Sequence, residues 1–144
     1  MDILKTAFDF LKESKNKGDT ETVLTRLFLL ECHHNRKILA MINWKNSTAE
    51  IIRLLAGEFN TDAARAVIGF INRGTIDYLF RVVIDREDEE MHNSRLISLI
   101  TKIEAIQVIA RLDPKGQLKH NKFNQRIDNL EKLLNDIIQN VGDK

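Results

Sequence analysis

Residues 20–44 have the sequence TETVLTRLFLLECHHNRKILAMINW, and their apolar side chains recur at the spacing of one helix face. At about 1.5 Å per residue this helix would be roughly 40 Å long, which makes it the longest element that the sequence predicts. A stripe of that length needs other helices to cover it. The stripe consists of Leu24, Leu27, Phe28, Ile38 and Ile42.

Helical spacing continues on both sides of this stretch. We expect a first helix that ends at Gly18 and whose apolar face consists of Ile3, Leu4, Ala7, Phe8 and Leu11. The capping box Ser47–Glu50 predicts a shorter helix that breaks at Gly57 and Asn60. Residues 61–72 and 78–84 are then expected to be helical as well.

The C-terminal half repeats the pattern. A long helix carries apolar residues from Leu96 to Ala110, and the turn Asp113-Pro114-Lys115-Gly116 follows it. Because short connections join antiparallel neighbours, the last helix should fold back on the one before it. Its apolar residues at heptad spacing are Phe123, Ile127, Leu130, Leu134, Ile137 and Val141.

Turn-forming residues are scarce in this chain. It has 6 glycines and 1 proline in 144 residues, whereas average usage of the two together is about 12%. This scarcity argues against β-sandwiches and disordered linkers. The sequence therefore predicts an all-α protein, a single domain over residues 1–144. We expect an antiparallel helical bundle of three long and three to four short helices, with an irregular middle at residues 46–85.

The expected location is the cytoplasm. Residues 1–15 contain acids and lysines instead of a continuous apolar core, so we expect no signal peptide, and no apolar run is long enough to span a membrane. A single cysteine, Cys32, excludes an intrachain disulfide framework. The sequence also lacks a phosphate-binding glycine loop and a nucleophile elbow, and we expect no cofactor.

Two polar residues interrupt the apolar stripe of residues 20–44. At 100° per residue, Glu31 and Asn35 fall on the same arc as Leu24 and Phe28, with His34 at its edge. A buried carboxylate needs a partner, because an unpaired one costs several kcal/mol or shifts its pKa. We interpret this cluster as a polar pair that fixes helix register, and a ligand pocket or an oligomer seam is the alternative.

The spacing Glu-x-x-His occurs at Glu31–His34 and at Glu89–His92. In di-iron carboxylate bundles, two such motifs and two further glutamates enclose the metals. If the first helix folds back at Gly18, Glu13 lies about 10 Å along the axis from Glu31. The first helix then does not supply the further glutamate that such a metal site needs. We therefore expect no metal centre, and Glu31, His34, Glu89 and His92 are the residues that would form one.

A second spacing, Arg-x(4–6)-His, occurs at Arg26–His33 and at Arg86–His92. It resembles the motif of HEPN-type ribonucleases, which are small helical bundles that dimerise. The resemblance implies that the motif's Arg and His act together on an RNA phosphodiester. It makes Arg26 and His33 the candidate catalytic pair, although Leu27 stands where that family usually has a polar residue.

The net charge of +1, from 22 basic and 21 acidic residues, conceals two opposite blocks. Residues 85–90, Asp-Arg-Glu-Asp-Glu-Glu, carry −4, and residues 115–126 carry +4. On a continuous helix the four bases would share one arc, near a helix start where the dipole disfavours them. This basic stripe consists of Lys115, Lys119, Lys122 and Arg126.

Charge separation of this kind predicts a partner. Our leading hypothesis is a non-enzymatic cytoplasmic interaction or regulatory module. It would form a homo-oligomer, with a dimer favoured, or bind an acidic protein. One alternative is an RNA-directed HEPN-like nuclease or RNA binder that uses the basic stripe, and another is a metal-carboxylate or small-ligand bundle that uses Glu31, His34 and Asn35.

Overall fold

The structure is a computed structural model that describes residues 17–42, 46–72 and 94–142. Every regular element in these residues is helical and none is a strand, which confirms the all-α prediction. None of the helices described combines the length and apolarity needed to cross a membrane. The apolar face of the expected first helix, Ile3 to Leu11, and the expected helix over residues 78–84 lie outside the described residues.

Helix α2, Lys17–Met41, is the long helix that the opening stretch predicts. It begins earlier than expected, so the prediction that Gly18 ends a preceding helix is wrong. Glycine in a helix costs only about 1 kcal/mol relative to alanine, which packing of the remaining turns can offset. The helix also ends before Trp44: a tighter turn from the Ile42 N–H to the Leu39 carbonyl, 3.2 Å, closes it.

The first part of the expected irregular middle forms two short helices, α3 (Ala49–Gly57) and α4 (Asp62–Asn72). The N-cap of α3 is Thr48, whose hydroxyl accepts the Ile51 N–H at 3.2 Å. The expected capping box with Ser47 as its cap is therefore wrong by one residue. Both hydroxyls suit a cap, and the extended backbone of Thr48 is what selects it.

Helix α5, Ser94–Leu112, is followed by the expected turn, in which the Gly116 N–H donates to the Asp113 carbonyl at 3.0 Å. Gly116 has a φ of +63°, a conformation that glycine adopts without steric cost. A short 3-10 helix, η3 (Lys119–Asn121), leads to the last helix, α6 (Phe123–Gly142). Its predicted apolar positions from Phe123 to Ile137 are buried.

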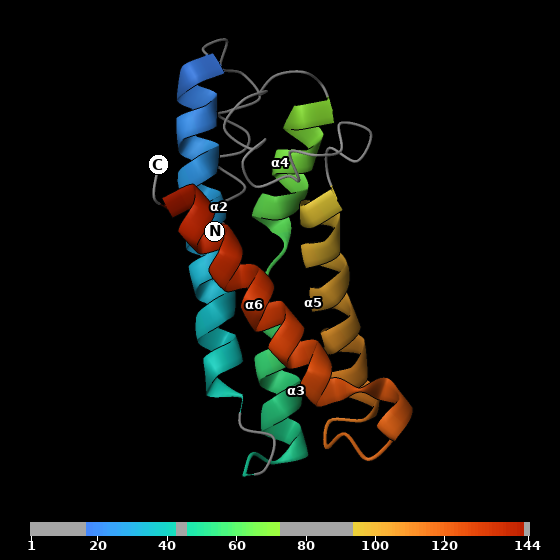
Figure 1. Ribbon diagram of the computed structural model, residues 1–144. Helices are drawn as coiled ribbons and strands as arrows, with labels where there is room; N and C mark the ends of the chain where they lie inside the picture. Colours follow the sequence, from blue (N-terminus) through green and yellow to red (C-terminus); the bar gives the residue numbers. More distant parts are fainter. Residues whose placement is uncertain (1–16, 43–45, 73–93, 143–144) are drawn as a thin grey trace.

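The helices enclose one apolar core (Figure 1). Helix α6 crosses obliquely and packs on both α2 and α5, while α3 and α4 lie behind it, one below the other, and also pack on both. The connection between α3 and α4 thus sits at mid-height in the molecule. The largest fully buried side chains are Phe28, Leu24, Ile52, Leu96, Leu99, Ile103, Ile106, Leu130 and Leu134.

Candidate functional site

The buried polar residues of α2 meet the start of α4. Glu31 is 5% exposed, and its carboxylate accepts the Ala63 N–H at 2.7 Å on Oε1 and the Ala64 N–H at 3.0 Å on Oε2. These N–H groups belong to the first turn of α4, where no intrahelical acceptor is available. Glu31 therefore caps a helix that begins 31 residues further along the chain.

Asn35 and His34 bind the residues just before α4. Asn35, 1% exposed, donates from Nδ2 to the Asn60 carbonyl at 2.8 Å and accepts the Asn60 N–H on Oδ1 at 2.9 Å. His34 donates from Nε2 to the Glu58 carbonyl at 2.7 Å. Three neighbouring side chains of α2 thus fix the α3–α4 junction, by which we mean residues 58–64.

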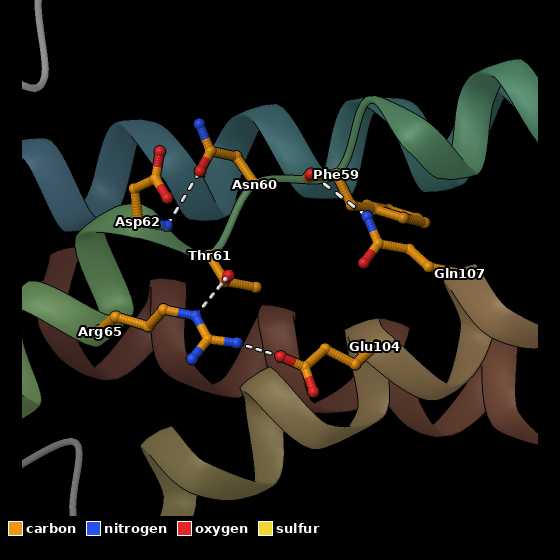
Figure 2. Close-up of polar contacts among 7 residues, drawn as sticks. All are labelled: Phe59, Asn60, Thr61, Asp62, Arg65, Glu104 and Gln107. Carbon is orange, nitrogen blue, oxygen red and sulfur yellow. Dashed lines mark hydrogen bonds and ion pairs between the residues drawn. The ribbon is translucent and has the colours of Figure 1, made fainter.

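Helices α4 and α5 hold the same junction from the other side (Figure 2). Gln107 of α5 donates from Nε2 to the Phe59 carbonyl at 3.5 Å, as Figure 2 shows. The same Nε2 donates to the Ala56 carbonyl at 3.1 Å. Arg65 donates to the Thr61 hydroxyl at 3.1 Å and forms an ion pair with Glu104. The sequence analysis missed Gln107, because an exposed-looking glutamine beside an apolar stripe carries no signal of its partner.

Burial raises the pKa of Glu31 to about 7, against the lowering effect of the two N–H bonds from Ala63 and Ala64. The negative charge of Asp62 raises this pKa further, while the backbone N–H of Asp62 lowers it. The neighbouring thiol of Cys32 is also buried, and burial raises its pKa, so it is poorly suited to act as a nucleophile. All the polar contacts described for Glu31 and Asn35 go to the junction. This agrees with the interpretation that the two residues are a polar pair that fixes how the helices align.

Of the residues in the Glu-x-x-His and Arg-x(4–6)-His motifs, the structure describes Glu31, His34, Arg26 and His33. No cluster of three or more His, Cys, Asp and Glu side chains that could hold a metal is found in the described part of the chain, and Glu89 and His92 lie outside it. Arg26 and His33 are both exposed on α2. The His33 Nδ1 accepts a hydrogen bond from Arg36 at 3.2 Å, one turn further along the helix.

The basic residues do not form the expected stripe on one helix. Helix α6 begins only at Phe123, because the backbone of Lys122 turns into the left-handed region with a φ of +50°. Lys115, Lys119 and Lys122 therefore precede the helix. Arg126 is on the first turns of α6, where its Nε donates to the Asn121 carbonyl at 2.8 Å.

The loop nevertheless brings three of the four bases together. Lys115, Lys119 and Lys122 border one open pocket of about 410 Å³ at the end of α5, and Arg126 is not part of its lining. Lys115 reaches across to the Ser47 carbonyl at 2.5 Å, while Lys119 and Lys122 are exposed. We call this the lysine pocket, and its other lining residues are Gly116, Leu118, Phe123, Asn124 and Gln125.

Asp113 shapes the wall of the lysine pocket. Its carboxylate accepts the Gln117 N–H on Oδ1 and the Leu118 N–H on Oδ2, both at 2.9 Å, and the Asn121 side chain at 3.2 Å. The sequence analysis assigned Asp113 only to the turn. An aspartate before Pro-x-Gly does indicate this arrangement, because its side chain can bind N–H groups that follow a tight turn. These bonds turn the acid toward the loop backbone.

Replacing Asp113 by asparagine should lower the thermal midpoint of unfolding, because an amide nitrogen cannot accept an N–H. The N–H of Leu118 first, and then those of Gln117 and the Asn121 side chain, hold the pKa of Asp113 below its ordinary value of 3.8. The carboxylate therefore stabilises the native state above that value, and this contribution is lost as the pH falls through the native pKa.

Melting curves near neutral pH and in acid check this prediction. The midpoint difference between wild type and D113N should be largest near neutrality and should shrink in acid. The exposed Asp128 on α6 supplies the control D128N. An equal difference at both pH values would mean that the Asp113 carboxylate does not hold the loop through its charge.

The described residues form an all-α fold with two polar regions. Side chains of α2 and α5 bind backbone groups at or next to the α3–α4 junction, and three lysines line an open pocket. Comparison of the chain with protein-family models, curated proteins and solved structures finds no match. Its function is therefore argued from the geometry alone.

Proposed function

We propose that this protein is a non-enzymatic cytoplasmic interaction module that binds an acidic protein partner at the lysine pocket and self-associates. The observation that carries the proposal is the pocket itself. Three lysines from a loop border one hollow, although a continuous helix would have placed them along its length. The first turn of α6 contains no acidic residue. Carboxylates are the protein groups that such a surface binds best.

The outer side of α5 supports self-association. Ile97, Val108 and Leu112 are 54%, 43% and 74% exposed, and 100° per residue places them opposite the buried face of that helix. Single exposed apolar side chains are ordinary, whereas an aligned set is typical of a surface that contacts protein. A helix with apolar residues on both faces agrees with an oligomer better than with an isolated monomer.

Residues 1–144 are proposed to form a single domain, an antiparallel bundle of three long and three to four short helices. Long helices α2, α5 and α6 and short helices α3 and α4 support this architecture. The proposed location is the cytoplasm, which the single buried cysteine supports, because disulfide frameworks belong to oxidising compartments.

An acidic protein is a better fit to the lysine pocket than RNA. Single-stranded RNA is bound on exposed aromatic side chains that stack with bases, and the aromatic residue of this pocket, Phe123, is buried. The HEPN-like pair gives RNA chemistry little support, since the His33 imidazole bonds to Arg36. RNA binding is retained as an outcome of the test.

Fluorescence anisotropy with a labelled hexaglutamate peptide tests the proposal, with a labelled single-stranded RNA as the second probe. At about 50 mM salt, where charge interactions are weakly screened, the wild type should bind the peptide. The variant K119E/K122E should weaken this binding about tenfold or more, since each tenfold step corresponds to only about 1.4 kcal/mol. The binding of both probes is then measured again at higher salt.

A matched control separates the pocket from the overall charge. K37E/K132E has the same net charge as the pocket variant, and both of its lysines are exposed on helices. It should bind hexaglutamate almost as the wild type does. Equal weakening in both variants, or no binding at low salt, would overturn the proposal, and tighter salt-sensitive binding of the RNA would replace it with the RNA-binding alternative.

A further inference from the structure

We infer that two copies of this protein pack antiparallel through the outer face of α5, with Leu112 of each copy seated in the hollow beside Thr101 of the other. The inference deepens the self-association in the proposed function and rests on it. Three features of the molecule carry it: the spacing of the outer residues of α5, a hollow between α4 and α5, and the charges beside them.

The outer face of α5 has the residue spacing of a surface that pairs with another helix. Four residues follow one another at steps of four, three and four positions, so they share one line along the helix. Helices α3, α4 and α6 pack on α5, yet Val108 and Leu112 on this line remain exposed. We call it the outer line, and it consists of Thr101, Ala105, Val108 and Leu112.

Two copies of the outer line fit each other when they run in opposite directions. The midpoint of Thr101 and Leu112 falls between residues 106 and 107, and the midpoint of Ala105 and Val108 is the same. A two-fold axis at that point therefore brings each residue opposite the other member of its pair. Each layer then sets a small side chain against a larger one, which lets the two helices approach closely.

A hollow in the surface is placed to receive Leu112 of the second copy. This open pocket of about 350 Å³ lies between α4 and α5, and three of its five lining residues are isoleucines, so it suits an apolar side chain. Thr101, which the two-fold axis brings opposite Leu112, belongs to the lining. The complete lining is Arg65, Ile68, Ile97, Ile100 and Thr101.

The charges beside the outer line favour the same register. Glu104 and Arg111 are exposed on one flank of α5, seven residues or about 10 Å apart along the axis, which is too far for a pair within the helix. The two-fold axis brings Glu104 of each copy beside Arg111 of the other. Glu104 keeps its ion pair with Arg65, which uses Oε1 (Figure 2), because a carboxylate accepts on both oxygens. Exposed pairs of this kind add little affinity but fix direction and register.

Sedimentation velocity over a concentration series at about 50 mM salt tests the inference. The wild type should form a reversible dimer. L112K should raise the dimer dissociation constant about tenfold or more, because it brings a second cation beside Arg65 in an apolar hollow. The matched control is L30K, since Leu30 on α2 is 65% exposed and Leu112 is 74% exposed. It should dimerise as the wild type does.

Charge exchange tests the register. E104R and R111E should each weaken the dimer about tenfold, because each sets like charges opposite one another twice. Mixed in equal amounts, the two variants should form a heterodimer about as stable as the wild-type dimer, since both ion pairs form again. E131R and K132E, at exposed positions of α6, change the net charge equally and should leave the dimer unchanged. Circular dichroism of each variant verifies that it retains the helical fold.

The outcomes separate this inference from the proposed function. If the wild type dimerises but L112K does so equally well, or if the mixture of E104R and R111E does not restore the dimer, self-association uses another face and the inference alone is wrong. A wild type that stays monomeric overturns the inference together with self-association. Binding of hexaglutamate would then still support the acidic partner of the lysine pocket.

Discussion

Replacing Glu31 by alanine should lower the free energy of unfolding by about 3 kcal/mol, the largest effect we expect from a single polar residue. The substitution leaves the N–H groups of Ala63 and Ala64 without their acceptor in a region where both residues are fully buried. A buried unsatisfied donor costs about 1–3 kcal/mol, and the vacated side-chain volume adds a cavity. Removal of a poorly solvated carboxylate offsets part of that cost.

Urea unfolding of the E31A variant measures this change, and hydrogen exchange localises it. The amides of Ala63 and Ala64 should exchange faster than in the wild type, while the amides at the centre of α6 should change only as far as global stability does. The exposed Glu131 supplies the control E131A, for which we expect a change within about 0.5 kcal/mol. A loss below about 1 kcal/mol in E31A would show that the start of α4 finds other acceptors.

The second large effect is the dependence of stability on pH. The native pKa of Glu31, about 7, lies above its ordinary value of 4.5, so the native state binds more protons between these values than the unfolded chain does. The contribution of Glu31 is therefore fully present below about pH 4.5 and is lost as the pH rises through 7. The difference of 2.5 pKa units corresponds to about 3 kcal/mol.

Comparison with E31Q isolates this titration, because glutamine stays neutral at every pH while the rest of the chain is unchanged. Relative to E31Q, the wild type should lose about 3 kcal/mol of unfolding free energy between about pH 5 and pH 8. A difference in unfolding free energy that is the same at every pH is the effect of replacing the carboxyl group by an amide. The difference in unfolding free energy between wild type and E31Q could instead stay constant with pH or change in the opposite direction. Either result would mean that the N–H bonds at the start of α4 keep Glu31 ionised.

Much of the fold follows from local sequence patterns. The apolar spacing located the bodies of α2, α4, α5 and α6, because one side of each helix must face the core. The ends of the elements were less predictable. Gly18 lies inside α2, and Thr48 instead of Ser47 caps α3, because several residues near each end suit the same role and packing decides between them.

The sequence likewise indicated part of each candidate site and left the rest undetermined. Burial of Glu31 and Asn35 follows from their positions on an apolar stripe. Their partners do not follow, because Ala63, Ala64 and Asn60 contribute backbone groups, and nearly every residue of a sequence carries such groups. The sequence grouped the four bases on one helix, whereas α6 begins after three of them.

The sequence by itself determined that this protein is helical, that two polar residues are buried in its longest apolar stripe, and that its charges are segregated. These properties depend on residue order within a few turns of helix. Only the tertiary structure decided that Glu31 caps α4, and that Asp113 and the left-handed Lys122 fold three lysines around one pocket. Both outcomes depend on hydrogen bonds to backbone groups, whose positions are set by the packing of distant segments.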